Sequence, residues 1–246
     1  MGITKAVRKF ERETLRSANM DYTNLRICEL GNQYMDELEN ASEKVSAKRI
    51  YATWGAQHLS IDLNGEDGAI KADLDKPISK SLMRKFDLVT NYGTLEHVNN
   101  QFQGFKNVHD LSRKGGVMIH TLPPPGSWQN HARYYYPKEF VTQLALVCEY
   151  KIINLTVQNC FDDMRYGSDK ILIMVAFQKS DNEHFPEKEV FDRIPILDTH
   201  DLTNTGNYTK PTRTLHWRTK NWASSQLAPH PRIKRITRKI LHKADR

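Results

Sequence analysis

Residues 27–32 read Ile27-Cys28-Glu29-Leu30-Gly31-Asn32, an apolar run that ends in an acid, a leucine and a glycine. Such a run predicts a buried strand with a carboxylate at its end, beside a turn where bare backbone can approach a ligand. Similar short apolar runs recur along the chain, and each predicts a further strand. The runs span residues 25–30, 59–63, 86–90, 117–122, 152–157 and 171–177.

Stretches with helical spacing accompany these runs. Apolar residues recur every three or four positions over residues 4–18, 99–113 and 137–149. Buried strands that alternate with helices predict an α/β fold with a parallel sheet covered on both faces. A short segment without helical spacing, residues 158–169, joins the last two runs, so this pair is predicted to be antiparallel. The pair Gly115-Gly116 predicts the end of a helix directly before the next strand.

Two further acids follow apolar runs. Asp62 ends the run that begins near His58, and Asp73 follows shortly after it. Ligands of open α/β sheets bind at the carboxyl edge of the strands, and an acid there can accept hydrogen bonds from ribose hydroxyls. The sequence therefore predicts a ligand site at this edge, with Asp62 on a ribose and Asp73 near a nucleobase.

Taken in order, these segments resemble class I S-adenosylmethionine-dependent methyltransferases. The resemblance covers roughly residues 22–178 and is closest to bacterial methyltransferases associated with surface-polysaccharide or other glycan synthesis. It implies a Rossmann-like, seven-stranded sheet with an antiparallel last strand and helices on both faces. The segments that carry it are residues 28–31, 60–63, 72–74, 86–98 and 113–120.

The resemblance also implies S-adenosyl-L-methionine as the cofactor. The first turn has one glycine where the family usually carries two or three. A nicotinamide dinucleotide would need Gly-x-Gly-x-x-Gly for its pyrophosphate, whereas adenosylmethionine has no phosphate and one glycine suffices. The residues implied to bind the cofactor are Glu29, Gly31, Asn32, Asp62, Leu63, Asp73, Leu74, Asn91, Tyr92, Gly93 and Glu96.

Methyl transfer to a hydroxyl requires an aligned nucleophile and a group that accepts its proton. The candidate bases are His97, His120 and His131, and His131 ranks first because its loop leaves the carboxyl end of the fifth strand. The alternative for each is a packed or hydrogen-bonded histidine without a catalytic role.

The loop that carries His131 also offers candidate substrate-binding residues. Trp128, Arg133 and Tyr134 have the chemistry to cover a sugar face or to grip an acidic group. In the alternative interpretation, residues 134–136 fasten the loop to the following helix. No metal site is predicted, because Asp162-Asp163 is typical of a solvated turn and Asn91 stands where metal-assisted methyltransferases place a carboxylate.

Charge is unevenly distributed. The formal charge is +7, yet residues 210–246 carry eleven basic side chains and one acid, which leaves the preceding chain slightly acidic. The tail has the charge to attract an anionic membrane or nucleic acid, or to neutralise the acidic body or a partner subunit. A predicted helix over residues 231–243, with isoleucines on one side, favours the membrane surface.

No long apolar run and no signal peptide is evident, which predicts a cytoplasmic protein with peripheral contact at the inner membrane face. Three parts are expected: a helical cap over residues 1–21, a cofactor-binding domain over 22–180, and a polar linker with a basic extension over 181–246. The predicted function is O-methylation of a glycan, either a sugar or a phosphate-bearing sugar derivative. The alternatives are an RNA or small-metabolite methyltransferase, or a non-catalytic binding module with the same fold.

Overall fold

The computed structural model describes residues 2–35, 45–159, 170–181 and 183–200. The basic tail with its predicted helix and the pair Asp162-Asp163 lie outside the described residues. No helix within these ranges is long and apolar enough to cross a bilayer.

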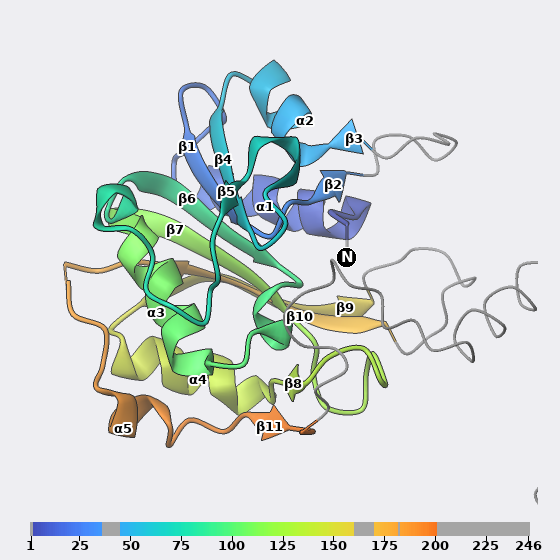
Figure 1. The fold of residues 1–246 in the computed structure, drawn as a ribbon, viewed down its shortest axis with the longest axis vertical. Coiled ribbons are helices and arrows are strands. Elements are labelled where there is room, and N and C mark those ends of the chain that lie inside the picture. The colour runs from blue at the N-terminus through green and yellow to red at the C-terminus, as the bar shows by residue number, and fades with distance from the viewer. Residues whose placement is uncertain (1, 36–44, 160–169, 182, 201–246) are drawn as a thin grey trace, which may run out of the picture. The chain divides into compact units, whose positions relative to one another are not determined.

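A seven-stranded sheet organises the described residues, in the order β5-β4-β1-β6-β7-β10-β9 (Figure 1). The first five strands in this order pair in parallel, and β10 pairs antiparallel with both β7 and β9. This confirms the predicted sheet and its antiparallel last strand. The bounds are β1 Arg26–Leu30, β4 Gln57–Asp62, β5 Ile70–Lys71, β6 Phe86–Tyr92, β7 Ser112–Leu122, β9 Lys151–Asn159 and β10 Ile171–Gln178.

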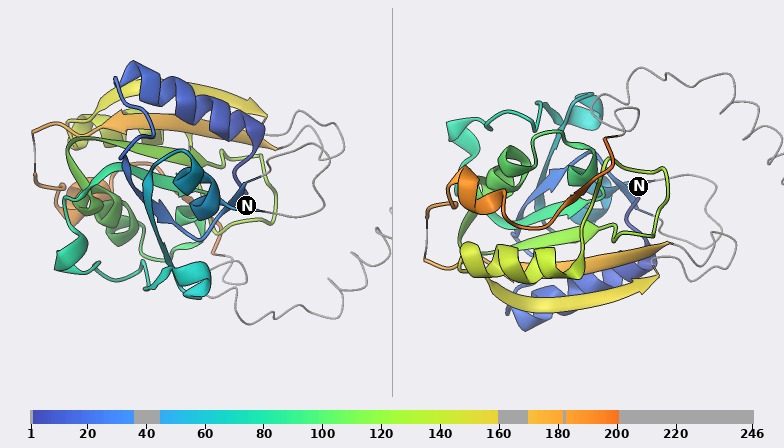
Figure 2. Two further views of the ribbon diagram at one scale, coloured as in Figure 1. Left: turned by 90° about the horizontal axis from the view of Figure 1, so that it is seen from above. Right: turned by 90° about the horizontal axis from the view of Figure 1, so that it is seen from below.

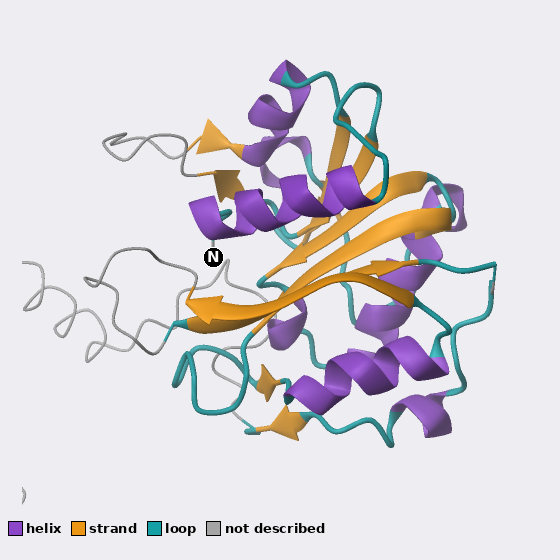
Figure 3. Ribbon diagram, turned by 180° about the vertical axis from the view of Figure 1, so that it is seen from behind, coloured by secondary structure: helices purple, strands orange, loops and turns teal. Residues whose placement is uncertain are grey.

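Helices cover both faces of the sheet, as predicted. Alternate residues of β1 divide between two buried clusters: Ile27 belongs to the one under α1 and α2, and Cys28 to the one under α3 and α4. Figure 2 shows α1 running along β9 and β10, and Figure 3 shows it crossing in front of the sheet. The helices are α1 Lys5–Ser17, α2 Ala47–Thr53, α3 Gln101–Leu111, α4 Lys138–Val147 and α5 Lys188–Phe191.

A buried carboxylate fastens α1 to the rest of the fold. Glu11 is fully buried on α1 and accepts hydrogen bonds from Tyr22 Oη at 2.6 Å, from Tyr51 Oη at 2.7 Å and from Tyr92 Oη. Burial raises the pKa of Glu11, and the three hydroxyls act in the opposite direction. Because Tyr51 belongs to α2 and Tyr92 to β6, this one side chain joins three elements.

The boundary between α3 and β7 differs from the prediction. The helix ends at Leu111, four residues before Gly115, and β7 begins at once with Ser112 paired to Phe86 of β6. Gly115 lies inside β7 with φ of 70°, where the register against β6 shifts. Its positive φ serves an irregularity in a strand rather than the predicted end of a helix.

Two small sheets follow the carboxyl ends of the strands, and the sequence did not reveal them. β2 (Tyr34–Met35) pairs with β3 (Val45–Ser46), and β8 (Tyr134–Tyr135) pairs with β11 (Leu197–Asp198), both antiparallel. Strands of two residues are too short to show an alternating pattern. The described residues also form three short 3₁₀ helices: η1 Glu66–Gly68, η2 Lys80–Leu82 and η3 Leu95–His97.

Candidate active site

The register of the sheet brings the predicted cofactor residues to one edge. Leu30 of β1 pairs with Ile61 of β4 on one side and with Asn91 of β6 on the other. Glu29, Asp62 and Asn91 therefore lie at the ends of three adjacent parallel strands. The strand order reverses between β1 and β6, which is where open α/β sheets bind ligands.

Glu29 is fully buried. Its Oε2 accepts the Gln33 backbone N–H at 3.1 Å and lies 3.4 Å from His58 Nε2, whereas its Oε1 accepts no hydrogen bond from the described residues. The carboxylate thus holds the turn after β1 and keeps one oxygen for a further donor. Sequence reasoning missed Gln33 and His58, although His58 begins the run that ends at Asp62.

Gly31 occupies a turn with no room for a side chain. Its φ is 78°, and a Cβ there would lie 2.5 Å from Thr94 Oγ1. The Thr94 hydroxyl donates to Leu30 O at 2.7 Å and so ties the end of β1 to the turn after β6. Glycine is required here for two reasons: the backbone has a positive φ, and Thr94 lies too close to leave room for a Cβ.

Asp62 organises the turn after β4. Its Oδ2 accepts the Asn32 N–H at 2.8 Å, and its Oδ1 accepts the Asn64 N–H at 3.0 Å. Each carboxylate oxygen has a second lone pair, so the group can accept two more hydrogen bonds. Leu63 follows directly and is partly buried.

Asp73 and Leu74 lie beyond this turn. Asp73 is partly exposed, accepts the Asp75 N–H at 3.0 Å and lies 3.4 Å from Lys76 Nζ. Leu74 is buried in the core cluster under α3.

Asn91 shapes the turn that follows β6. Its Oδ1 accepts the backbone N–H groups of Thr94 at 3.2 Å and Leu95 at 3.0 Å, which starts η3 just past Gly93. Gly93 has φ of 81°. The Tyr92 side chain points elsewhere, since its hydroxyl donates to Glu11 under α1.

His120 is packed in the core. Its ring stacks on Phe105 at 5.3 Å between centroids and meets Phe177 at 5.7 Å. Because Asn91 Oδ1 already accepts two N–H groups, its amide nitrogen faces His120 Nδ1 at 3.2 Å and donates to it. Burial lowers the pKa of His120 to about 3, so the ring is neutral at pH 7. This placement matches the packed alternative rather than a base facing substrate.

The free energy of unfolding should fall as pH is lowered from about 6.5, the pKa of an exposed histidine, toward about 3, the pKa of buried His120. In that interval the unfolded chain binds the proton and the folded chain does not, so acid favours unfolding. We expect His120→Phe to lessen this pH dependence, measured by urea unfolding at several pH values. The exposed-site variant His184→Ala should retain it, and equal slopes in wild type and His120→Phe would contradict the assignment.

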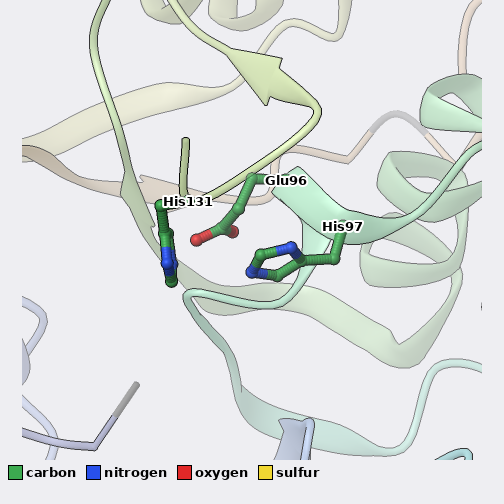
Figure 4. Close-up of side chains that lie close together, drawn as sticks. All are labelled: Glu96, His97 and His131. Carbon is green, nitrogen blue, oxygen red and sulfur yellow. The ribbon is translucent and has the colours of Figure 1, made fainter. Parts of the chain in front are cut away.

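Three groups converge at η3. The ligand atoms of Glu96, His97 and His131 all lie within 4.8 Å of one another, and the Glu96 carboxylate points into the space between the two imidazole rings (Figure 4). The two rings meet edge to face with centroids 5.0 Å apart. Two of the three predicted bases are thus together with a predicted cofactor residue, and His120 is not among them.

Burial sets the protonation of this cluster. It raises the pKa of Glu96 to about 7 and lowers the pKa of His131 to about 4. At pH 7 the imidazole of His131 is therefore neutral, and the Glu96 carboxyl is divided between its two forms. Both groups can accept a proton from a nearby hydroxyl.

The elements that present the cluster are held at several points. Gln101 Nε2 donates to Leu95 O and Val98 O, each at 2.7 Å, and Tyr136 Oη donates to Gln101 Oε1 at 2.7 Å. Sequence reasoning missed Gln101, because a glutamine at the start of an amphipathic helix carries no distinctive signal.

Tyr135 holds the other side of the cluster. Its hydroxyl donates to Trp128 O at 2.8 Å and accepts the His131 N–H at 3.3 Å. Trp128 is itself buried, and its indole N–H donates to Ile171 O at 2.9 Å at the start of β10. The loop that carries His131 is therefore fixed to the sheet.

The polar groups predicted to bind substrate are engaged within the chain. Arg133 makes a two-pronged ion pair with Asp198 at 2.8 and 2.7 Å and also donates to Asn99 Oδ1 at 2.8 Å. The Arg133 guanidinium lowers the pKa of Asp198 to about 2. Tyr134 Oη donates to Asn99 O at 2.8 Å. These contacts favour the alternative in which this segment fastens the loop.

Comparison with known proteins adds to this geometry. No family profile matches the sequence, and neither does any curated protein. The 1,6-didemethyltoxoflavin-N1-methyltransferase of Burkholderia thailandensis, solved with 1,6-didemethyltoxoflavin and S-adenosylhomocysteine bound, is similar in structure. Its TM-score is 0.50 at 10% identity, over 72% of this chain and 80% of that one.

Two other solved structures are similar to the same extent. A Listeria monocytogenes protein described as an S-adenosylmethionine-dependent methyltransferase has a TM-score of 0.51 at 14% identity, over 72% of this chain and 99% of that one. The cyclase SpnF has a TM-score of 0.50 at 10% identity, over 74% of this chain and 84% of that one. At these identities the likeness shows the fold, which is the Rossmann-like fold found in S-adenosylmethionine-dependent methyltransferases.

Proposed function

We propose that the chain is an S-adenosylmethionine-dependent methyltransferase. The observation that carries this proposal is the pair of carboxylates Glu29 and Asp62, which end adjacent parallel strands on either side of the Gly31 turn. They lie at the point where the strand order reverses. The methyltransferase fold of the similar structures also supports this proposed function.

The residues present suit this cofactor. Asp62 retains acceptor capacity for two ribose hydroxyls, and buried Glu29 Oε1 has no donor among the described residues and so suits the amino group of the methionine part. The turn at Gly31 has no side chain to obstruct the approach. When bound, the cofactor supplies a methyl group already activated by a sulfonium centre.

The chain's own residues would align the acceptor and receive its proton. The acceptor oxygen would form a bond to the methyl carbon as the carbon–sulfur bond breaks, and the electron pair of that bond would pass to sulfur. The hydroxyl proton passes to the cluster of Glu96, His97 and His131, which follows β6 and β7 on the same edge. The loop around Trp128, which is fixed to β10, would exclude water from the site.

For the acceptor we propose a sugar hydroxyl, or a hydroxyl of a phosphate-bearing sugar derivative, in glycan synthesis. The sequence resemblance supports this class, and the cluster supports a hydroxyl acceptor, because an alcohol must lose a proton on methylation. Small metabolites and RNA are the alternatives. The similar fold of a cyclase is the reason to test methyl transfer directly rather than assume it from the fold.

Calorimetric titration of the full chain with S-adenosylmethionine and with S-adenosylhomocysteine tests the proposal. We expect both to bind at one site. Transfer of a labelled methyl group is then measured on separate panels of nucleotide sugars, small metabolites and RNA. Failure of either ligand to bind would reject the methyltransferase and favour a binding module. Labelling confined to the small metabolites or to RNA would overturn the glycan assignment.

A further inference from the structure

We propose that Glu96, His97 and His131 bind one divalent transition-metal ion, a site that the sequence did not predict. Three ligand atoms of suitable type lie within 4.8 Å of one another, and they come from η3 and from the loop after β7. The missing carboxylate at Asn91 argued against a metal at the end of β6. The structure gathers a different set, from residues beyond the strand ends.

The Glu96 carboxylate carries the argument. Glu96 is fully buried, and neither of its oxygens accepts a hydrogen bond from another described residue. The nearby Tyr136 hydroxyl donates to Gln101 instead. A buried carboxylate without a partner is costly, and a bound cation removes that cost. His131 Nε2 is likewise buried without a hydrogen-bond partner among the described residues.

The donor set selects the class of metal. Two imidazoles with one carboxylate suit zinc, iron(II), manganese or cobalt, whereas magnesium and calcium prefer oxygen ligands alone. Ligand atoms about 2.1 Å from a tetrahedral ion lie roughly 3.4 Å apart. The three groups need to approach one another by little more than about 1 Å, which rotations of the side chains can supply.

The backbone around the site is already held in place. Asn91 fixes the start of η3, and Gln101 fixes its end. Tyr135 holds the His131 loop from the other side. Such fixed surroundings are what orient the ligands of a metal site.

Three protein ligands leave at least one coordination position open, which is typical of catalytic rather than structural sites. We assign this open coordination position to the acceptor hydroxyl, an assignment that rests on the proposed function. Coordination lowers the pKa of a bound hydroxyl, its proton leaves to solvent, and the oxygen then attacks the methyl carbon. With the ion bound, Glu96, His97 and His131 act as its ligands, and the hydroxyl proton goes to solvent instead of to one of these side chains.

The test is titration of metal-free full-length protein with Zn²⁺ by calorimetry and with Co²⁺ by visible absorption. We expect one site of micromolar or tighter affinity that Mg²⁺ does not occupy. Glu96→Gln and His131→Ala should each weaken it by at least the roughly 10–100-fold that loss of a second-shell partner costs. The exposed histidines His184 and His200 provide matched controls, because His184→Ala and His200→Ala should leave the site intact.

Circular dichroism of each variant reports whether it folds, and a change in the Co²⁺ spectrum reports ligand loss in any variant that does. Unchanged affinity in folded Glu96→Gln and His131→Ala, or absence of a one-to-one site in the wild type, would overturn the proposal. Titration of the metal-free wild type with S-adenosylmethionine keeps the two proposals separate. Binding of the cofactor without any metal site would reject this inference alone, and a metal site without cofactor binding would reject the proposed function alone.

Discussion

Asp62→Ala should weaken the binding of S-adenosylmethionine by roughly 150-fold. Two hydrogen bonds from ribose hydroxyls to a carboxylate are worth about 3 kcal/mol together. The variant also removes the acceptor for the Asn32 and Asn64 N–H groups, which shape the turn around the ligand. Calorimetric titration of the folded variant measures the change.

Asp67→Asn is the matched control for this substitution. It removes one negative charge from the same turn at a residue with φ of 52°, a conformation that asparagine tolerates. We expect its affinity for the cofactor to stay close to that of the wild type. Equal affinities for Asp62→Ala and Asp67→Asn would show that Asp62 does not hold the ribose.

Glu11→Ala should lower the free energy of unfolding by roughly 3–6 kcal/mol, because it leaves three tyrosine hydroxyls without their acceptor. Two of these tyrosines, Tyr51 and Tyr92, are fully buried. Urea unfolding followed by tryptophan fluorescence measures the loss.

Glu13→Ala controls for helix propensity and charge, since Glu13 lies on the exposed side of the same helix. It should change the free energy of unfolding by little. Glu11→Gln should fall between the two, because an amide oxygen accepts at most two of the three hydroxyls and its nitrogen cannot accept any. A loss for Glu11→Ala no larger than that for Glu13→Ala would remove the structural role assigned to the buried carboxylate.

The strand order and the edge with its carboxylates were accessible from the sequence. Continuous apolar runs mark buried strands, and the short connection over residues 158–169 predicted the antiparallel pair that β9 and β10 form. The acids at Glu29 and Asp62 follow such runs directly, so their place at the sheet edge follows from local pattern alone.

Side-chain partners distant in sequence were not accessible in this way. His120 lies near the end of β7, but whether it faces Phe105 or the site depends on which face of the sheet it occupies. Arg133 finds Asp198 sixty-five residues later through β8 and β11, two strands too short to leave a pattern. The cluster of Glu96 and His131 depends on the path of a loop, which local propensity does not determine.

The position of α1 bears on how the chain is made. This helix is synthesised before the other described helices and strands, yet Thr14 accepts a hydrogen bond from Asn154 Nδ2 across 140 positions, and its neighbours β9 and β10 are the last strands of the large sheet. Val7, Phe10 and Leu15 have no complete surface to pack on until synthesis has passed Gln178. High contact order of this kind slows folding and exposes apolar surface during translation. A nascent chain stalled before β10 should therefore be recognised by chaperones at its N-terminal helix.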